Sequence, residues 1–167
     1  MKSYWRLANF ISLGNLLCGT FSIFCSVNHE FQPALFLILL GVVFDFLDGK
    51  IARHLGQASN FGKGLDSLSD CVTFGIAPAT MGAVLVNGLL WPGFVLALFV
   101  SAGAWRLAYF MQWSEKGRPP GMPITMNGLF FPLLFLFHVQ MNLIFVFFLV
   151  STGLMVVPIL RYGPEVS

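Results

Sequence analysis

The strongest constraint on this chain is a long run without charge: from Pro119 to Leu160 not one Asp, Glu, Lys or Arg occurs. As a single α-helix this run would be roughly 60 Å long, about twice the thickness of the hydrocarbon core of a bilayer. His138, Gln140 and Asn142 interrupt it near its middle. The run therefore predicts two membrane-spanning helices joined by a short turn.

Composition extends this prediction to the whole chain. Apolar residues make up 57% and charged residues 10% of the sequence, whereas a soluble domain carries about 25% charged residues. The 167 residues leave room for about six spans and little else. We therefore expect an all-α integral membrane protein with six transmembrane helices, as a single domain over residues 1–167 with a short interfacial segment at about 1–8. A net charge of +2 does not favour a nucleic-acid partner.

Breaks between the apolar stretches set the expected spans. The first four are expected at 10–27, at 31–54, at 61–86 and from the Trp91–Pro92 turn to about 112. Basic residues then fall at both termini and in the second and fourth loops: Lys2, Arg6, Lys50, Arg53, Lys63, Lys116, Arg118 and Arg161. With six spans these regions lie on one side, which the positive-inside rule makes cytoplasmic. The sequence thus predicts a multi-pass protein of the cell membrane with cytoplasmic N- and C-termini.

Acidic residues gather on that same side. Asp45 and Asp48 stand three apart on the second expected helix, and Asp66 and Asp70 stand four apart on the third. Residues at these spacings share a helix face, and a short loop makes the two helices antiparallel neighbours. The spacing therefore predicts a cluster of four carboxylates.

Such a cluster needs cations, because one ionised Asp at the centre of a membrane helix costs about 2.5–3.5 kcal/mol on insertion scales. Carboxylate oxygens without His or Cys suit Mg²⁺ or Mn²⁺, and four carboxylates suffice for a two-metal site. Two alternatives remain open: an interfacial salt-bridge cluster with Lys50, Arg53 and Lys63, or the cation pathway of a small transporter. Gly49 and Gly62 beside the acids favour close approach of a phosphate or ribose instead.

These residues also form a recognisable pattern. It resembles the signature of the CDP-alcohol phosphotransferase family at all eight defining positions: Asp45, Asp48, Gly49, Ala52, Arg53, Gly62, Asp66 and Asp70. The resemblance implies a six-helix membrane fold that is usually homodimeric. Further runs are similar to members that use L-serine, namely Leu13–Thr20, Asp66–Ala79, Arg106–Phe110 and Gly121–Ile124. They imply transfer of a phosphatidyl group from CDP-diacylglycerol to L-serine, with glycerol phosphate or inositol phosphate as the alternative acceptor.

The resemblance also implies roles for individual residues. Two divalent ions, Mg²⁺ or Mn²⁺, would be held by the four aspartates, the first by Asp45, Asp48 and Asp66 and the second with Asp66 and Asp70. Asp70 would be the general base. Gly49, Ala52 and Gly62 would let the cytidine diphosphate lie close to the helices, and Arg53 would counter its charge.

Three further polar residues lie in apolar surroundings. Asn15 and Thr20 on the first helix are candidate nucleotide contacts, with ordinary helix–helix hydrogen bonding as the alternative. Arg106, near the end of the fourth span, needs an anionic partner. We expect either an acceptor carboxylate or phosphate, or an ion pair with one of the aspartates.

Overall fold

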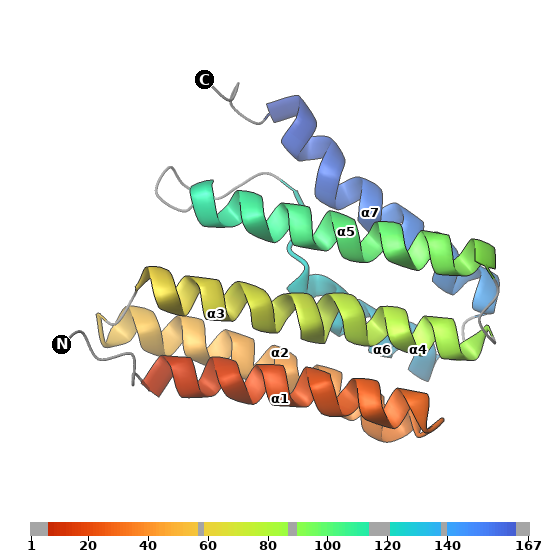
Figure 1. Cartoon of the computed structure of the whole chain (residues 1–167), viewed down its shortest axis with the longest axis horizontal. Helices are drawn as coiled ribbons and strands as arrows, with labels where there is room; N and C mark the ends of the chain where they lie inside the picture. The colour runs from red at the N-terminus through yellow and green to blue at the C-terminus, as the bar shows by residue number, and fades with distance from the viewer. Residues whose placement is uncertain (1–6, 57–58, 87–89, 114–120, 138–139, 163–167) are drawn as a thin grey trace.

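A computed structural model describes residues 7–56, 59–86, 90–113, 121–137 and 140–162 (Figure 1). These residues form helices and connections only, which confirms the predicted all-α class. The helices are α1 (Leu7–Val27), α2 (Phe31–His54), α3 (Asn60–Asp70), η1 (Cys71–Ile76), α4 (Ala77–Leu85), α5 (Leu90–Trp113), α6 (Thr125–Leu136) and α7 (Met141–Tyr162). Because α3, η1 and α4 run on as one helix from Asn60 to Leu85, the described chain forms the six predicted rods.

Helix α2 has the bounds expected from the sequence. Pro33 stands in its first turn, where the missing N–H costs no helical hydrogen bond. After the last turn Gly56 has a positive φ of 60°, the left-handed conformation that commonly stops a helix. Local signals at both ends therefore define this element.

Helix α6 is shorter than a full span. Its 12 residues cover about 18 Å, against about 30 Å for the hydrocarbon core. The preceding residues 121–124 are not helical and approach the middle of the bundle (Figure 1). By length and composition, three helices in the described ranges can cross a membrane: Leu7–Val27, Asn60–Leu85 and Leu90–Gln112.

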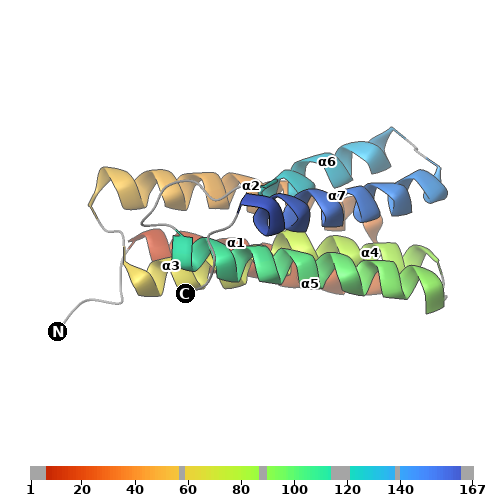
Figure 2. The ribbon, with the colours of Figure 1, turned by 90° about the horizontal axis from the view of Figure 1, so that it is seen from above.

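The rods pack as two layers. Helices α2, α6 and α7 lie on one side, and the α3–α4 rod and α5 on the other (Figure 2); α1 packs along both α2 and α3, and α5 along α7. Phe74, Phe99, Phe131 and Phe148 are fully buried between the layers. These aromatic side chains thus form a buried core that holds the two layers together.

One end of the bundle gathers the functional candidates. Helices α1 and α3 begin there, and α2 and α5 end there (left in Figure 1). Lys50, Arg53 and Lys63 lie on the helices of this end. The interfacial segment before Leu7, the loop with Lys116 and Arg118, and the C-terminal residues lie outside the described residues, so the predicted membrane orientation stays a prediction.

The third rod is irregular directly after its second aspartate. Over η1 the hydrogen bonds widen to the π pattern, with the N–H of Ala77 donating to the carbonyl of Val72. Pro78 follows and has no N–H, so the α-helical ladder cannot be complete here. The widened turn brings Thr73 and Phe74 into fully buried positions beside α1 and α2.

Candidate active site

The four aspartates meet between α2 and α3. Carboxylate oxygens of Asp45, Asp48 and Asp66 all lie within 4.8 Å of one another. Asp70 interacts electrostatically with all three and is 6% exposed. The structure therefore brings the four carboxylates together, as their spacing in the sequence predicts.

Hydrogen bonds from other helices hold three of these carboxylates in place. Ser12 on α1 donates its hydroxyl to Oδ2 of Asp48 at 2.5 Å. Asn15, one turn further along, donates Nδ2 to Oδ1 of Asp70 at 3.1 Å. Thr125, the first residue of α6, is hydrogen-bonded to Asp45. Sequence reasoning missed Ser12 and Thr125 at the site.

A signal for Ser12 was present in the sequence. Asn9, Ser12 and Asn15 recur every three residues in the first half of α1, and all three are buried. In a membrane helix, buried polar positions of this kind face other helices or a cavity. This stripe of α1 therefore faces the aspartates.

The donor set fits a hard divalent cation. Asp66 Oδ1 is buried and has no hydrogen-bond partner among the described residues. An ionised oxygen left in this way is costly unless a cation compensates it. Together with the two neighbouring carboxylates this gives an all-oxygen ligand set, which suits Mg²⁺- or Mn²⁺-like ions rather than zinc.

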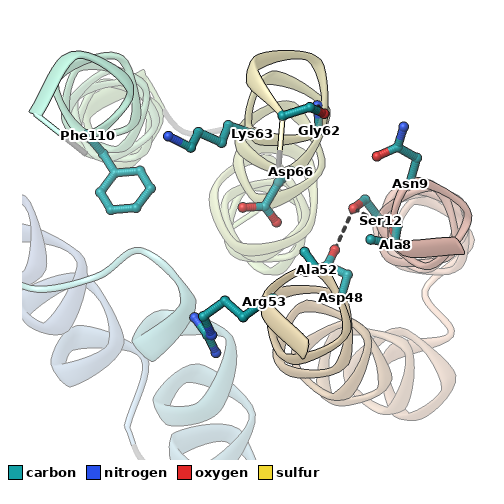
Figure 3. A pocket seen from close by; sticks show the side chains of 12 residues that line it. Ala8, Asn9, Ser12, Asp48, Ala52, Arg53, Gly62, Lys63, Asp66 and Phe110 are labelled. Carbon is teal, nitrogen blue, oxygen red and sulfur yellow. Dashed lines mark hydrogen bonds between the residues drawn. The ribbon is translucent and has the colours of Figure 1, made fainter. Parts of the chain in front are cut away.

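A cavity of about 190 Å³ opens on the α1 side of the cluster (Figure 3). Its walls carry Asp48 and Asp66 together with every small or basic residue expected beside the nucleotide: Gly49, Ala52, Arg53 and Gly62. Ala8, Asn9, Ser12, Ser59, Lys63 and Phe110 complete the lining. We call this space the α1 cavity.

The two glycines of the α1 cavity differ in what surrounds them. A Cβ at Gly62 would lie 3.0 Å from Oδ1 of Asn9 and 3.2 Å from Oγ of Ser59, the N-cap that accepts from the Gly62 N–H. A Cβ at Gly49 would meet only the Arg53 guanidinium at 3.9 Å. Gly62 thus allows close packing against α1, whereas Gly49 leaves cavity space open.

A second cavity of about 470 Å³ lies on the other side of the cluster. Asp45, Asp66, Asp70 and Arg106 supply its charged groups, and Thr125 a hydroxyl. Ser67, Leu107, Phe110, Gly121, Pro123 and Ile124 form the remaining wall. We call it the α6 cavity. Asp66 and Phe110 line both cavities, so the two spaces adjoin at the carboxylates.

Arg106 is the buried cation of the α6 cavity. The residue is 6% exposed, and its Nε has no hydrogen-bond partner among the described residues. Asp70 attracts it electrostatically. A buried guanidinium with a free donor is expected to bind an anion that enters the cavity.

The two candidates on α1 lie in different surroundings. Asn15 is fully buried against Asp70 and is absent from the linings of both cavities described above. Thr20 is exposed and donates to the carbonyl of Leu16 in its own helix. The structure therefore brings Asn15 to the aspartates but does not bring Thr20 there.

These features define a class: a multi-pass helical membrane protein whose clustered carboxylates offer an all-oxygen ligand set for a divalent cation between two cavities. The CDP-alcohol phosphatidyltransferase family model matches residues 5–159. The chain belongs to this family. The resemblance seen in the signature residues is thereby confirmed.

Two of the similar proteins are named as serine O-phosphatidyltransferases and a third as an archaetidylserine synthase. The chain is 37% identical to the CDP-diacylglycerol–serine O-phosphatidyltransferase of Bacillus subtilis over 71% of this chain and 69% of that protein. It is 31% identical to the archaetidylserine synthase of Methanothermobacter thermautotrophicus over 97% of this chain and 71% of that protein. With the CDP-diacylglycerol–serine O-phosphatidyltransferase of Saccharomyces cerevisiae it shares 39% identity over 63% of this chain and only 41% of that protein.

Proposed function

We propose that this protein transfers a phosphatidyl group from CDP-diacylglycerol to the hydroxyl of L-serine, which gives phosphatidylserine and CMP. The observation that carries the proposal is the position of the four aspartates between two adjoining cavities. A reaction between two substrates needs a separate space for each, with the reacting atoms at the junction. Relatives named for the same reaction support this assignment.

The α1 cavity would hold the cytidine diphosphate. Gly49 and Ala52 leave space along α2, and Gly62 lets α3 pack closely against α1 at the cavity wall. Arg53 from α2 faces this space (Figure 3) and would counter the diphosphate charge. The lipid chains would then extend into the surrounding bilayer.

The α6 cavity would hold the acceptor. Arg106, whose Nε has no hydrogen-bond partner among the described residues, would bind the serine carboxylate, because a guanidinium fork matches a carboxylate in geometry and charge. The serine hydroxyl would then lie toward Asp70 on the same cavity wall. Asp70 would accept its proton while the serine oxygen forms the new bond to phosphorus and CMP leaves.

Divalent cations would be bound by the aspartates, one by Asp45, Asp48 and Asp66 and another with Asp66 and Asp70. We propose Mg²⁺ or Mn²⁺ for both. When bound, such ions neutralise the carboxylates and the phosphate oxygens. The protein itself supplies orientation through Ser12 and Thr125, which hold Asp48 and Asp45.

The assembly around this site is also a proposal. The chain would act as a single domain in a homodimer, within the cell membrane. The site would face the cytoplasm, as the basic residues of its end favour.

An acceptor panel tests the proposed function. Purified protein in liposomes with CDP-diacylglycerol and Mg²⁺ or Mn²⁺ is offered L-serine, glycerol 3-phosphate, inositol phosphate or no alcohol. We expect CMP release that depends on serine. Release stimulated by another alcohol instead would reassign the acceptor, and release that responds to none would contradict the proposal.

Gly49→Val is expected to weaken CDP-diacylglycerol binding roughly 10- to 100-fold, because overfilling a defined space costs about 1–3 kcal/mol. The added methyl groups enter the α1 cavity, where a Cβ meets only Arg53. Equilibrium binding of the nucleotide lipid measures the effect. Gly93→Val is the matched control, since Gly93 is exposed on α5 and a Cβ there meets nothing within 4 Å. Normal binding by Gly49→Val would refute close approach of the nucleotide at this residue.

Arg106→Gln is expected to raise the KM for serine roughly 10- to 100-fold, the scale of one lost charge-assisted hydrogen-bonded contact. The KM for CDP-diacylglycerol should change far less. Arg53→Gln, on the α1 cavity, provides the matched comparison with the opposite pattern. Steady-state kinetics with each substrate varied in turn separates the two. Equal effects of Arg106→Gln on both KM values would place Arg106 on the donor phosphates.

A further inference from the structure

Asn15 lies where α1, α2 and η1 meet, and its side chain is held from several directions. The residue is fully buried. Thr73 of η1 donates its hydroxyl to the Asn15 backbone carbonyl at 2.9 Å. On α2, a Cβ at Gly41 would lie 2.9 Å from Oδ1 of Asn15. Only a glycine at that position leaves room for the amide, so its orientation is restricted by packing.

The restricted amide acts on one partner. Its Nδ2 donates to Oδ1 of Asp70, while its own Oδ1 has no partner among the described residues. A carboxylate that accepts a hydrogen bond on one oxygen loses rotational freedom about its Cα–Cβ and Cβ–Cγ bonds. The Asp70 carboxylate is therefore oriented by a hydrogen bond from α1, while the residue also lines the α6 cavity.

The chemistry of an amide suits this task. Asn15 is neutral, so it orients a carboxylate without cancelling the negative charge that proton acceptance needs. A lysine or arginine in its place would hold Asp70 as well, but its charge would weaken the basicity of the carboxylate. Because Asn15 lines neither cavity, its position does not favour a direct contact with substrate.

We propose that Asn15 is a positioning residue for Asp70: it fixes the carboxylate in the orientation that receives the proton of the acceptor hydroxyl. This inference rests on the proposed function, in which Asp70 is the base. It assigns to Asn15 a role different from the nucleotide contact that the sequence suggested.

The test compares Asn15→Leu and Asn15→Asp with Ser22→Ala. Leucine keeps the approximate volume and removes the donor, and aspartate keeps the shape but turns an acceptor toward Asp70. Ser22 is the matched control, because it is fully buried on the same helix and donates to the carbonyl of Ala34 on α2, away from the aspartates. For each protein in liposomes, kcat, the KM for serine, the Kd for CDP-diacylglycerol and the Tm are measured.

We expect kcat to fall at least about tenfold in both Asn15 variants, the scale of a misplaced catalytic group. The KM for serine and the Kd for CDP-diacylglycerol should stay within about twofold. Ser22→Ala should have a lower Tm than wild type and an unchanged kcat. A purely structural role would instead give Asn15→Leu the pattern of Ser22→Ala.

Two results would overturn the inference. One is a kcat within about twofold of wild type in both Asn15 variants; the other is weakened CDP-diacylglycerol binding with kcat retained, which would make Asn15 a donor contact. The wild-type protein separates this failure from that of the proposed function. If wild type shows no serine-dependent CMP release, the proposed function itself fails and the inference with it.

Discussion

Asp70→Asn is expected to lower kcat by roughly 10²-fold or more, the usual scale for loss of a general base. The substitution keeps the size of the side chain and one oxygen for a cation, but it removes the basicity. A serine hydroxyl is a weak nucleophile at neutral pH, so a positioned group must take its proton as the oxygen attacks phosphorus. CDP-diacylglycerol should still bind in the presence of divalent metal.

Single-turnover kinetics and equilibrium binding on the same preparation check this expectation. Ser69→Ala is the matched control: Ser69 is the buried neighbour of Asp70, donates to backbone carbonyls of Ser12 and Leu65 and is absent from the linings of both cavities. It should retain kcat. Loss of donor binding with little change in kcat would identify Asp70 as a cation ligand only, and the base would lie elsewhere.

Asp45→Ala and Asp48→Ala are each expected to reduce activity at least roughly 10³-fold, since bound cations supply several kcal/mol to such a reaction. The geometry explains the dependence. The carboxylate oxygens of Asp45, Asp48 and Asp66 lie within 4.8 Å of one another. Two unit charges at that separation repel by about 3 kcal/mol at an effective dielectric constant of about 20. The cluster therefore needs cations to remain ionised, and chelation should abolish turnover as well.

Activity after treatment with a chelator, and after re-addition of Mg²⁺ or Mn²⁺, measures this dependence directly. Glu30→Ala serves as the control, because Glu30 is an exposed acid at the start of α2, at the opposite end of that helix from Asp45 and Asp48. It should leave activity unchanged. Near-normal turnover in Asp45→Ala or Asp48→Ala would show that the cluster is structural.

The sequence predicts the helices of this fold well where the signals are local. Helix α2 begins and ends as expected, because Pro33 and Gly56 act on their own turns. The charge-free run after Pro119 gives no such signal for the start of α6. That start depends on tertiary contacts: Gly121 has φ +100°, and the Met122 N–H donates to the Leu154 carbonyl of α7 at 3.2 Å. A pattern of apolar residues does not encode that pairing.

The same distinction applies to the site. The four aspartates could be predicted because their spacings of three and four place each pair on one helix face. Ser12 and Asn15 act across 36 and 55 residues of sequence, so their partners follow from how α1 packs rather than from a motif. Pro78 was a local signal for the π-helical turn after Asp70, but the resulting burial of Thr73 against Asn15 again required the packed bundle.

The most direct test of the account is the stoichiometry of the reaction. Wild-type protein in liposomes containing CDP-diacylglycerol is supplied with L-serine and Mg²⁺ or Mn²⁺, and CMP and lipid products are quantified together. We expect CMP and phosphatidylserine in equal amounts, with neither formed when serine or the divalent ion is left out. CMP release at the same rate without serine, or turnover that persists after chelation, would contradict it.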